Sequence, residues 1–560
     1  MTSFKDKVIY EIYPKSFQDS NGDGWGDLRG VTKRLDYLKE LGVDYLWLTP
    51  FFISPQNDNG YDVENYREID PRYGTMEDLE ELIHEADQRG IGLMLDMVFN
   101  HTSTAHEWFQ RAMKGEKKYQ DYYIFKEGTE DQLPTNWESK FGGPAWEYVP
   151  SLRKWYLHLY DVSQADLNWE NPEVRKELKE VIRFWKEKGI KGFRFDVVNV
   201  ISKPEKYEDD TIGDGRRFYT DGRHVHEFIK ELVRDTGIED MVTVGEMSST
   251  SLENCIRYSN PEEKELSMCF NFHHLKIDYR DGQKWELMEP DLKAMKNLFR
   301  TWQEGMQEKN GWNALFWCNH DQPRIVSRLG NEEKYWKESA KMLAGAIHLM
   351  QGTPYIYQGE ELGMTNAHFT SIDQYMDVES RNYFEILRKN GKSEAEALHI
   401  LAERSRDNAR TPMQWTNSEN AGFTDGQPWI EVQKNYDKVS VIAEENDDTS
   451  ILAFYKKLIV FRKQNSIISH GTIRFLDEMP KAVMGYEREW QEKKMVVLCN
   501  FKEEEVWVSY KEEWKDYGRI LGNYEGSKEE EELSVQIQAA QEGQKKLKLR
   551  AYEFVVIGDK

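Results

Sequence analysis

The chain has 560 residues, more than a single hydrophobic core holds, so we expect one large domain with smaller ones beside it. With 39% hydrophobic and 31% charged residues, the composition is that of an ordinary globular protein. A net charge of -25 argues against nucleic acid and anionic membranes as partners, and no stretch approaches the roughly 18 apolar residues of a membrane helix.

The first segment of the chain, MTSFKDKVIYEIYPKSF, lacks the sustained apolar run of a signal peptide. The cysteines have no metal-like spacing, so free thiols are expected at Cys255, Cys269, Cys318 and Cys499. We therefore expect a protein of the reducing cytoplasm. We also expect a monomer or a weak oligomer.

Short apolar runs alternate with amphipathic helical stretches along most of the chain, which predicts βα units and a parallel sheet. The expected strands span residues 8–14, 43–50, 92–98, 192–198, 241–247, 266–272, 314–321 and 354–361. Helices such as those at 75–90 and 171–189 have apolar residues three and four positions apart. Eight strands separated by helices favour an α/β fold closed as a (β/α)8 TIM barrel.

The spacing of these elements predicts the domain organisation. We expect the barrel over residues 1–100 and 169–470, with a helical excursion at 365–410 and a returning helix at 448–465. The third and fourth strands lie far apart in the chain, so residues 101–168 are expected to form a small inserted domain. Period-two patterns predict a C-terminal antiparallel β domain over 471–560, in which the acidic run at 528–533 is a solvated loop.

Polar side chains gather where four of the expected strands end. They are Asp96, Asn100 and His101 on the third strand, Arg194 and Asp196 on the fourth, Glu246 on the fifth, and Asn319, His320 and Asp321 on the seventh. Because active sites of such barrels lie at the carboxyl ends of the strands, these groups are expected to converge on one rim.

The carboxyl groups suit glycoside hydrolysis, which needs one carboxylate at the anomeric carbon and one protonated carboxyl at the leaving oxygen. Asp196 and Glu246 can supply both, and Arg194 should face the same way as Asp196 and keep it ionised. Asp321 would stabilise positive charge on the sugar. Each acid alone could be a helix cap or a surface carboxylate, and only their joint placement favours a site.

The motifs DMVFNH, GFRFDVV, GEM and NHD resemble the four ordered sequence regions of the α-amylase family of glycoside hydrolases, and QADLN at 164–168 resembles a fifth. The resemblance implies that Asp196 is the nucleophile, Glu246 the acid and base, and Asp321 the transition-state stabiliser. It also implies sugar binding by His101, His320 and Arg194. The family retains anomeric configuration without a catalytic cofactor, so the two working carboxyls should lie about 5–5.5 Å apart.

Two further segments resemble the exo-acting α-glucosidase branch, which includes oligo-1,6-glucosidases: NDNGYD at 57–62 and SRDNARTPMQW at 405–415. By this resemblance Asp58 and Arg410 close the pocket behind a single glucose, and Tyr61 stacks on its ring. Each could instead be a loop tether. Val197, directly after the nucleophile, resembles relatives that cut α-1,6 or unusual linkages.

The early segment DSNGDGWGD carries oxygen groups at alternating positions, as in the first part of an EF-hand loop: Asp19, Asn21, Asp23, the Trp25 carbonyl and Asp27. The twelfth position is Gly30, so the bidentate Glu is missing. The segment resembles the single structural calcium loop of this branch. Without Ca2+ the same residues would form an Asx-rich turn.

Cationic residues around the sixth strand indicate the substrate. His273, His274, Lys276 and Lys284 follow one another there, and a sugar phosphate of roughly -1.5 to -2 charge needs such fixed cations on an acidic protein. The segment resembles family members that split α,α-trehalose 6-phosphate into glucose and glucose 6-phosphate, with His273, Lys276 and Lys284 as phosphate ligands.

Three other interpretations stay open at this point. The chain could be an oligo-1,6-glucosidase or a sugar isomerase acting on neutral disaccharides, or a non-catalytic member of the fold. The lysines could instead be solvated surface charges, with the histidines as packing residues. From the cationic residues around the sixth strand, the expected partner is a small-molecule sugar phosphate.

Overall fold

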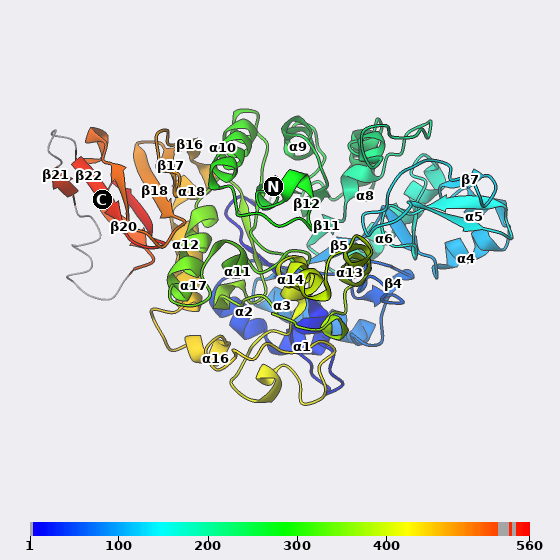
Figure 1. Ribbon diagram of the computed structural model, residues 1–560, viewed down its shortest axis with the longest axis horizontal. Helices are drawn as coiled ribbons and strands as arrows, with labels where there is room; N and C mark the ends of the chain where they lie inside the picture. Colours follow the sequence, from blue (N-terminus) through cyan, green and yellow to red (C-terminus); the bar gives the residue numbers. More distant parts are fainter. Residues whose placement is uncertain (1–3, 525–536, 540–544, 560) are drawn as a thin grey trace.

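A computed structural model describes residues 4–524, 537–539 and 545–559. Figure 1 shows a central barrel, with the C-terminal strands at one end of the long axis and the cyan region around β7 and α5 at the other. The acidic run at 528–533 lies outside the described residues. None of the helices in the described part is long and apolar enough to cross a membrane.

Eight parallel strands form the barrel, in the order β13-β12-β11-β5-β2-β1-β15-β14. They are β1 (Ile9–Ile12), β2 (Tyr45–Leu48), β5 (Gly92–Met97), β11 (Gly192–Phe195), β12 (Val242–Met247), β13 (Met268–Asn271), β14 (Ala314–Leu315) and β15 (Thr353–Tyr357). A parallel bridge between Cys269 and Asn313 joins the two edges. The predicted (β/α)8 barrel is confirmed.

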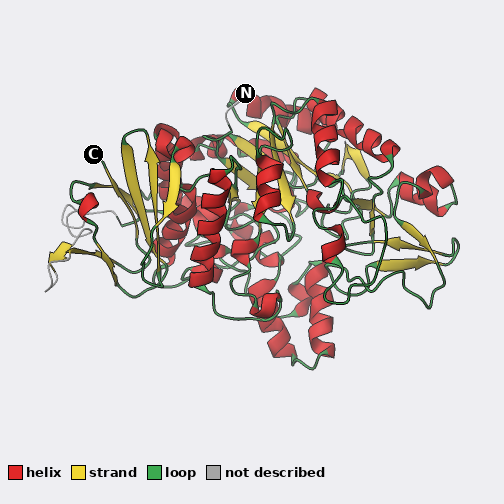
Figure 2. Cartoon of the chain, turned by 90° about the horizontal axis from the view of Figure 1, so that it is seen from above, coloured by secondary structure: helices red, strands yellow, loops and turns green. Residues whose placement is uncertain are grey.

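The barrel helices begin where the sequence supplies caps. In α3 (Met76–Gln88) the Thr75 side chain and Asp78 form a capping box, and α6 (Pro172–Glu187) starts at the Asn171 cap with proline in its first turn. Further helices around the strands are α1 (Leu28–Lys33), α2 (Leu35–Leu41), α7 (Arg216–Tyr219), α8 (Val225–Thr236), α9 (Leu252–Ser259), α10 (Leu292–Glu308), α11 (Ile325–Leu329), α12 (Trp336–His348), α16 (Val441–Glu444), α17 (Ile451–Gln464) and α18 (Ser466–His470). Figure 2 shows helices surrounding the central strands.

The seventh strand is shorter than predicted. The expected strand spans 314–321, but β14 ends at Leu315. In the loop that follows, the Asn319 side chain accepts a hydrogen bond of 2.9 Å from the Asp321 backbone N–H and forms an Asx turn. The turn directs Asp321 toward the rim.

A region with its own small sheet separates β5 from β11. It contains α4 (Glu107–Met113), α5 (Lys117–Gln120) and an antiparallel sheet of β7 (Phe125–Glu127), β9 (Lys154–Leu157) and β8 (Trp146–Val149). At its base β10 (Gln164–Asp166) pairs with β6 (His101–Ser103), so that the residues entering and leaving the region lie side by side. Before it, β3 (Phe52–Ile53) pairs with β4 (Asn65–Ile69) and frames the loop at 57–62.

After β15 the chain forms α13 (Val378–Lys389), α14 (Glu394–Arg404) and α15 (Asp407–Arg410). The C-terminal part is an antiparallel sheet of β16 (Thr472–Phe475), β17 (Val483–Trp490), β18 (Lys493–Asn500), β23 (Phe554–Gly558) and β20 (Gly518–Gly522). A second antiparallel sheet contains β19 (Val506–Ser509), β22 (Lys545–Leu549) and β21 (Ile537–Ala539). The predicted C-terminal antiparallel region is confirmed.

Candidate active site

One cavity of about 220 Å³ opens at the carboxyl ends of the barrel strands. Its ionisable lining residues include Asp58, His101, Lys140, Asp196, Glu246, Lys276, Asp321 and Arg406. Its aromatic lining residues are Tyr61, Phe141, Tyr160, Phe272 and Tyr279. The barrel, the inserted region and the excursion after β15 all contribute to this lining.

A single buried arginine connects the acids of three neighbouring strands. Arg194 on β11 is 1% exposed, and one guanidinium nitrogen donates to Asp96 Oδ1 and to Asp196 Oδ1 at 2.7 Å each. The other terminal nitrogen contacts Glu246 Oε2. Asp196 and Glu246 therefore share one cation, and both line the cavity.

This cluster contains more carboxylates than cations. Burial raises the pKa of Asp196 well above its usual value, Arg194 opposes that rise, and the neighbouring Glu246 adds to it. Burial likewise raises the pKa of Asp96 to about 6. Burial and the crowded negative charge therefore favour the protonated forms of Asp96 and Asp196, and Arg194 favours their ionised forms.

Asp321 has the opposite environment. Burial alone would raise its pKa, but His320, Arg406 and Arg410 outweigh this and hold the pKa of Asp321 well below its usual value. Arg410 donates to Asp321 Oδ1 at 2.7 Å and Arg406 at 3.3 Å. Carboxyl groups whose environments push their pKa values apart can take different roles in one reaction.

The backbone turns sharply after the first of these acids. Val197 has φ 35° and ψ 38°, in the left-handed region that a β-branched residue rarely adopts. Such a conformation costs on the order of 1–3 kcal/mol and persists where the surroundings enforce it. Here the Asp196 backbone N–H donates to Met97 O at 3.1 Å, which fixes the turn against β5.

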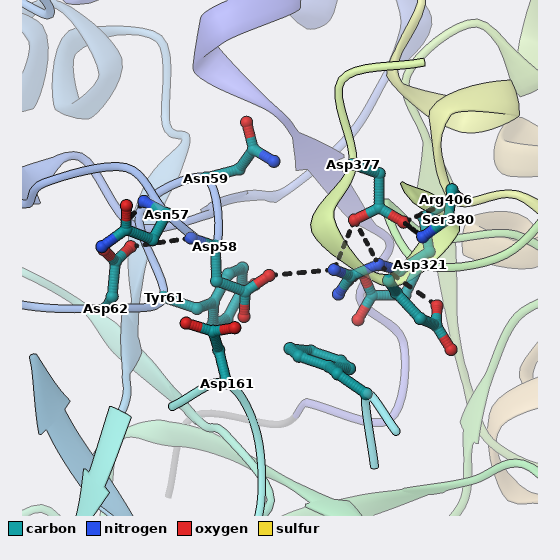
Figure 3. A network of polar contacts seen from close by, with 12 residues as sticks. Asn57, Asp58, Asn59, Tyr61, Asp62, Asp161, Asp321, Asp377, Ser380 and Arg406 are labelled. Atoms are coloured by element: carbon teal, nitrogen blue, oxygen red, sulfur yellow. Dashed lines mark hydrogen bonds and ion pairs between the residues drawn. The ribbon is translucent and has the colours of Figure 1, made fainter. Parts of the chain in front are cut away.

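Asp58 is held from two sides by distant parts of the chain. Its Oδ1 contacts Arg406 at 2.9 Å, and its Oδ2 accepts from Gln164 Nε2 at 3.0 Å. Figure 3 shows the Arg406 guanidinium between Asp58 and Asp377. We expect Arg410 beside Asp58 from the sequence, but the structure places Arg406 there, four residues earlier in the chain, and Arg410 contacts Asp321 instead.

The histidines at the rim pack against Tyr61 and its loop. The Tyr61 and His320 rings stack with centroids 5.0 Å apart, and the Tyr61 hydroxyl donates to Asp96 Oδ2 at 2.8 Å. His320 Nδ1 lies 2.6 Å from Glu11 Oε1 on β1. His101 Nε2 lies 3.2 Å from the Tyr61 carbonyl oxygen. Tyr61 and His101 therefore line the cavity, whereas His320 stacks behind Tyr61 and is not among the lining residues.

The expected phosphate ligands do not all reach the cavity. Lys276 lines it, but the His273 ring packs against Trp302 with centroids 4.8 Å apart, and burial lowers the pKa of His273 to about 4. Lys284 Nζ donates to Glu379 Oε2 at 2.6 Å, so its charge is neutralised locally. Neither of these two residues is among those that line the cavity.

Lys140, from the inserted region, also lines the cavity. Its Nζ lies 3.4 Å from Asp214 Oδ2, and burial lowers the pKa of Lys140 to about 8. The sequence gives no signal for this residue, because it lies in an irregular segment far from any strand end. Only the folding of the inserted region over the barrel brings Lys140 to the same cavity as Lys276.

The loop at 19–27 turns its oxygens toward its own backbone. Asp19 Oδ1 accepts from the N–H groups of Asn21 and Gly22, and Asp27 Oδ1 caps α1 through the N–H of Gly30. Asp23 Oδ1 likewise accepts from the N–H of Trp25. Throughout the described residues, no three His, Cys, Asp or Glu side chains converge as they would around a metal ion. The donor set suits Ca2+, but the geometry is that of an Asx-rich turn.

Comparison with known proteins places this geometry in a family. Residues 11–471 match the model of the α-amylase catalytic domain. The chain is 54% identical to a trehalose-6-phosphate hydrolase of Escherichia coli (strain K12), over 93% of this chain and 94% of that protein. It is 47% identical to an oligo-1,6-glucosidase of Parageobacillus thermoglucosidasius, over 89% and 90%.

A crystal structure of Bacillus licheniformis trehalose-6-phosphate hydrolase superposes with a TM-score of 0.91, at 50% identity and 99% coverage of both chains. The catalytic-domain match covers most of the chain, and the acids and Arg194 lie together at the rim of the barrel. The chain therefore belongs to the α-amylase family of glycoside hydrolases.

Proposed function

We propose that the chain is a retaining α-glucosidase that hydrolyses α,α-trehalose 6-phosphate to glucose and glucose 6-phosphate. The observation that carries the substrate is the pair of lysines, Lys140 and Lys276, that line the same cavity as the catalytic carboxyls. The similarity to trehalose-6-phosphate hydrolases supports the same substrate.

In this proposal the unphosphorylated glucose occupies the inner part of the pocket. Asp196 attacks its anomeric carbon while Glu246 donates a proton to the leaving oxygen of glucose 6-phosphate, and a glucosyl ester forms on Asp196. Glu246 then takes a proton from water, which attacks the same carbon and releases Asp196. Two inversions give retention. Asp321, held ionised by two arginines, stabilises the positive charge that develops on the sugar.

The inner pocket is suited to one neutral hexose. Asp58, His101 and Asp321 supply hydrogen-bonding groups, and Tyr61 supplies a ring face. The Asp58–Arg406 contact closes the pocket behind that sugar, which favours cleavage of a terminal glucose. Burial raises the pKa of Asp58 to about 7 despite this arginine.

The phosphate is recognised by fixed charge. In the described part of the chain no carboxylate lies within 4.0 Å of Lys276 Nζ, so its charge is free for a ligand. Burial lowers the pKa of Lys276 from its usual value, and a phosphate beside it would restore that pKa. A charge-assisted hydrogen bond of this kind contributes about 1.5–3 kcal/mol.

Product analysis tests the proposal directly. Incubation with α,α-trehalose 6-phosphate should release equal amounts of glucose and glucose 6-phosphate, with glucose first appearing as the α-anomer. Trehalose and isomaltose should be poorer substrates as judged by kcat/KM. If isomaltose is the best of the three, the chain is an oligo-1,6-glucosidase and the phosphate proposal fails.

Lysine variants test the phosphate contact separately. Lys276→Ala and Lys140→Ala should each raise KM for trehalose 6-phosphate about 10-fold or more, because each removes a contact to the phosphate, which is remote from the reacting bond. KM for an aryl α-glucoside, which has no phosphate, should change by less than about 2-fold. Lys284→Ala is the matched comparison, because that lysine pairs with Glu379. Its replacement should change KM by the same factor for both substrates. Equal losses on both substrates would contradict the assignment.

We also propose that the loop at 19–27 binds a structural Ca2+. Its donors are three carboxylates, one carboxamide and the Trp25 carbonyl, and an oxygen that accepts one amide proton keeps a second lone pair. Adding Ca2+ to EDTA-treated protein should raise Tm, and Asp23→Ala should remove this rise. An unchanged Tm would leave the loop as a metal-free Asx turn. A cytoplasmic location agrees with the charge of the substrate, which does not cross membranes unaided.

A further inference from the structure

A buried lysine lies behind the sugar pocket without a carboxylate partner. The Lys15 side chain is 5% exposed, and its Nζ lies 3.9 Å from the ring centroids of both Trp25 and Trp429. Within the described ranges no Asp or Glu oxygen lies within ion-pair distance of this ammonium group. Two indole rings therefore contact the ammonium group directly and stabilise its charge.

The same ammonium group donates one hydrogen bond, to Asn59 Oδ1 at 2.9 Å. Asn59 has φ 50° and is followed by Gly60 at φ 104°, so the loop turns through two left-handed residues between Asp58 and Tyr61. Figure 3 shows that the Asn59 side chain points away from the Asp58 carboxylate. Lys15 thus holds the loop from behind while Asp58 faces the cavity.

Packing alone does not account for a lysine at this position. Burial of an ammonium group costs free energy, and here it lowers the pKa of Lys15 to about 7. An apolar side chain would fill the space between two indole rings without that cost. What such a side chain could not do is donate to Asn59, which fixes the loop that carries Asp58 and Tyr61.

We propose that Lys15 is a positioning residue of the sugar pocket, which acts through Asn59 to hold Asp58 and Tyr61 against the terminal glucose. Trp25 belongs to the loop at 19–27, so Lys15, which contacts both Trp25 and Asn59, also connects that loop to the pocket. The Trp429 backbone N–H donates to Gly24 O at 3.0 Å, which joins the second ring to the same loop. The inference rests on the proposed pocket role of Asp58.

The test is a double-mutant cycle with an aryl α-glucoside and with trehalose 6-phosphate. Lys15→Met should lower kcat/KM by up to about 100-fold, and by the same factor for both substrates, because both place glucose in the same pocket. Combined with Asp58→Ala it should cause a clearly smaller further loss than in the unmodified chain, because the part of its effect that passes through Asp58 is already gone and only the part through Tyr61 remains. A purely structural lysine would instead give losses that multiply.

Two further variants make the cycle decisive. Lys5→Met is the control, because Lys5 Nζ lies 4.6 Å from the single ring of Trp312, away from the cavity, and it should leave kcat/KM unchanged. If Lys15→Met does not fold, Asn59→Gly removes the acceptor while tolerating φ 50°, and should give the same loss.

The two possible failures are distinguishable. Normal kcat/KM in Lys15→Met or Asn59→Gly, alongside an impaired Asp58→Ala variant, overturns the positioning role alone. An active Asp58→Ala variant removes the pocket role of Asp58 and this inference with it.

Discussion

At the scale of single residues, two carboxyl groups on the same rim have environments that shift their pKa values in opposite directions. Asp196 shares Arg194 with Asp96 and Glu246, and burial raises its pKa, whereas Asp321 contacts Arg406 and Arg410 and its pKa is lowered. The first environment favours the protonated form of a carboxyl group, and the second favours the ionised form. Carboxyl groups whose pKa values are pushed apart in this way can take different roles in one reaction.

Replacing Asp196 with Asn keeps the shape and the Arg194 contact but removes the carboxylate that we propose as the nucleophile. We expect kcat for an aryl α-glucoside to fall more than about 10³-fold, or ~4 kcal/mol in activation free energy. Tm should not fall, because the change removes one charge from a cluster with excess carboxylates. The Glu246→Gln variant is the comparison, since a good leaving group needs no acid and should still give a burst of product. Retained turnover in Asp196→Asn would eliminate Asp196 as nucleophile.

Arg406, which contacts both Asp321 and Asp58, should influence the acid limit of activity. Arg406→Gln removes a cation that lowers the pKa values of both carboxyl groups, so both pKa values rise and both groups become protonated at a higher pH. The acid limb of the kcat profile should therefore move to higher pH. Arg388→Gln, on the exposed side of α13, should leave the profile unchanged. A uniform loss with an unmoved acid limb would contradict the electrostatic role.

The sequence identifies most residues of this rim but not all of them. Asp196 and Glu246 follow from strand ends, because the carboxyl ends of barrel strands meet at one edge. Arg406 and Lys140 do not, because their place depends on how an excursion and an inserted region fold over the barrel. Motif position also cannot tell Arg406 from Arg410, four residues apart on the same segment.

At the scale of elements, the regular parts were predictable and the irregular ones were not. Apolar runs gave all eight barrel strands, since parallel strands are buried on both faces. The end of β14 was missed because the apolar run continues past Leu315, and the Asx turn at Asn319 follows only in the loop beyond it. His273 could not be distinguished from a cavity residue, because its direction depends on packing against Trp302 in α10.

One buried arginine on α17 joins this helix to the barrel through hydrogen bonds. Arg462 is 1% exposed and donates to the carbonyl oxygens of His348, Lys5 and Gly352 at 3.1, 2.6 and 2.5 Å. Arg462→Met leaves these carbonyls without that donor, so we expect a loss of about 3 kcal/mol in unfolding free energy with normal kcat at 25 °C. Thermal unfolding followed by circular dichroism measures it.

Lys456→Met on the same helix is the control for that variant. Lys456 is partly exposed and pairs with Glu40 at 3.8 Å, so its loss should cost less than about 1 kcal/mol. Equal destabilisation by the two variants would show that Arg462 contributes no more than a surface ion pair.

At the scale of the whole molecule, the substrate site is assembled from three parts of the chain. Asp196 comes from the barrel, Lys140 from the inserted region and Arg406 from the excursion after β15. On a chain of net charge -25, an anionic substrate is attracted only where the fold collects local cations. Substrate choice is therefore a property of the assembled fold, whereas the chemistry belongs to the barrel strands.

The C-terminal sheet is joined to the barrel through a close contact that only glycine permits. A Cβ at Gly345 in α12 would lie 2.5 Å from ring atoms of Phe554 on β23, which is fully buried. Gly345→Leu should therefore push the sheet away from α12 and cost roughly 1–3 kcal/mol by overpacking. Because the cavity lies on another face of the barrel, kcat at low temperature should stay normal while Tm falls and proteases release the C-terminal part. Glu338→Leu, in the first turn of the same helix, introduces the same leucine in place of a side chain of similar size and should change neither. Loss of kcat in proportion to Tm would mean that the C-terminal sheet shapes the catalytic rim as well as stabilising the barrel.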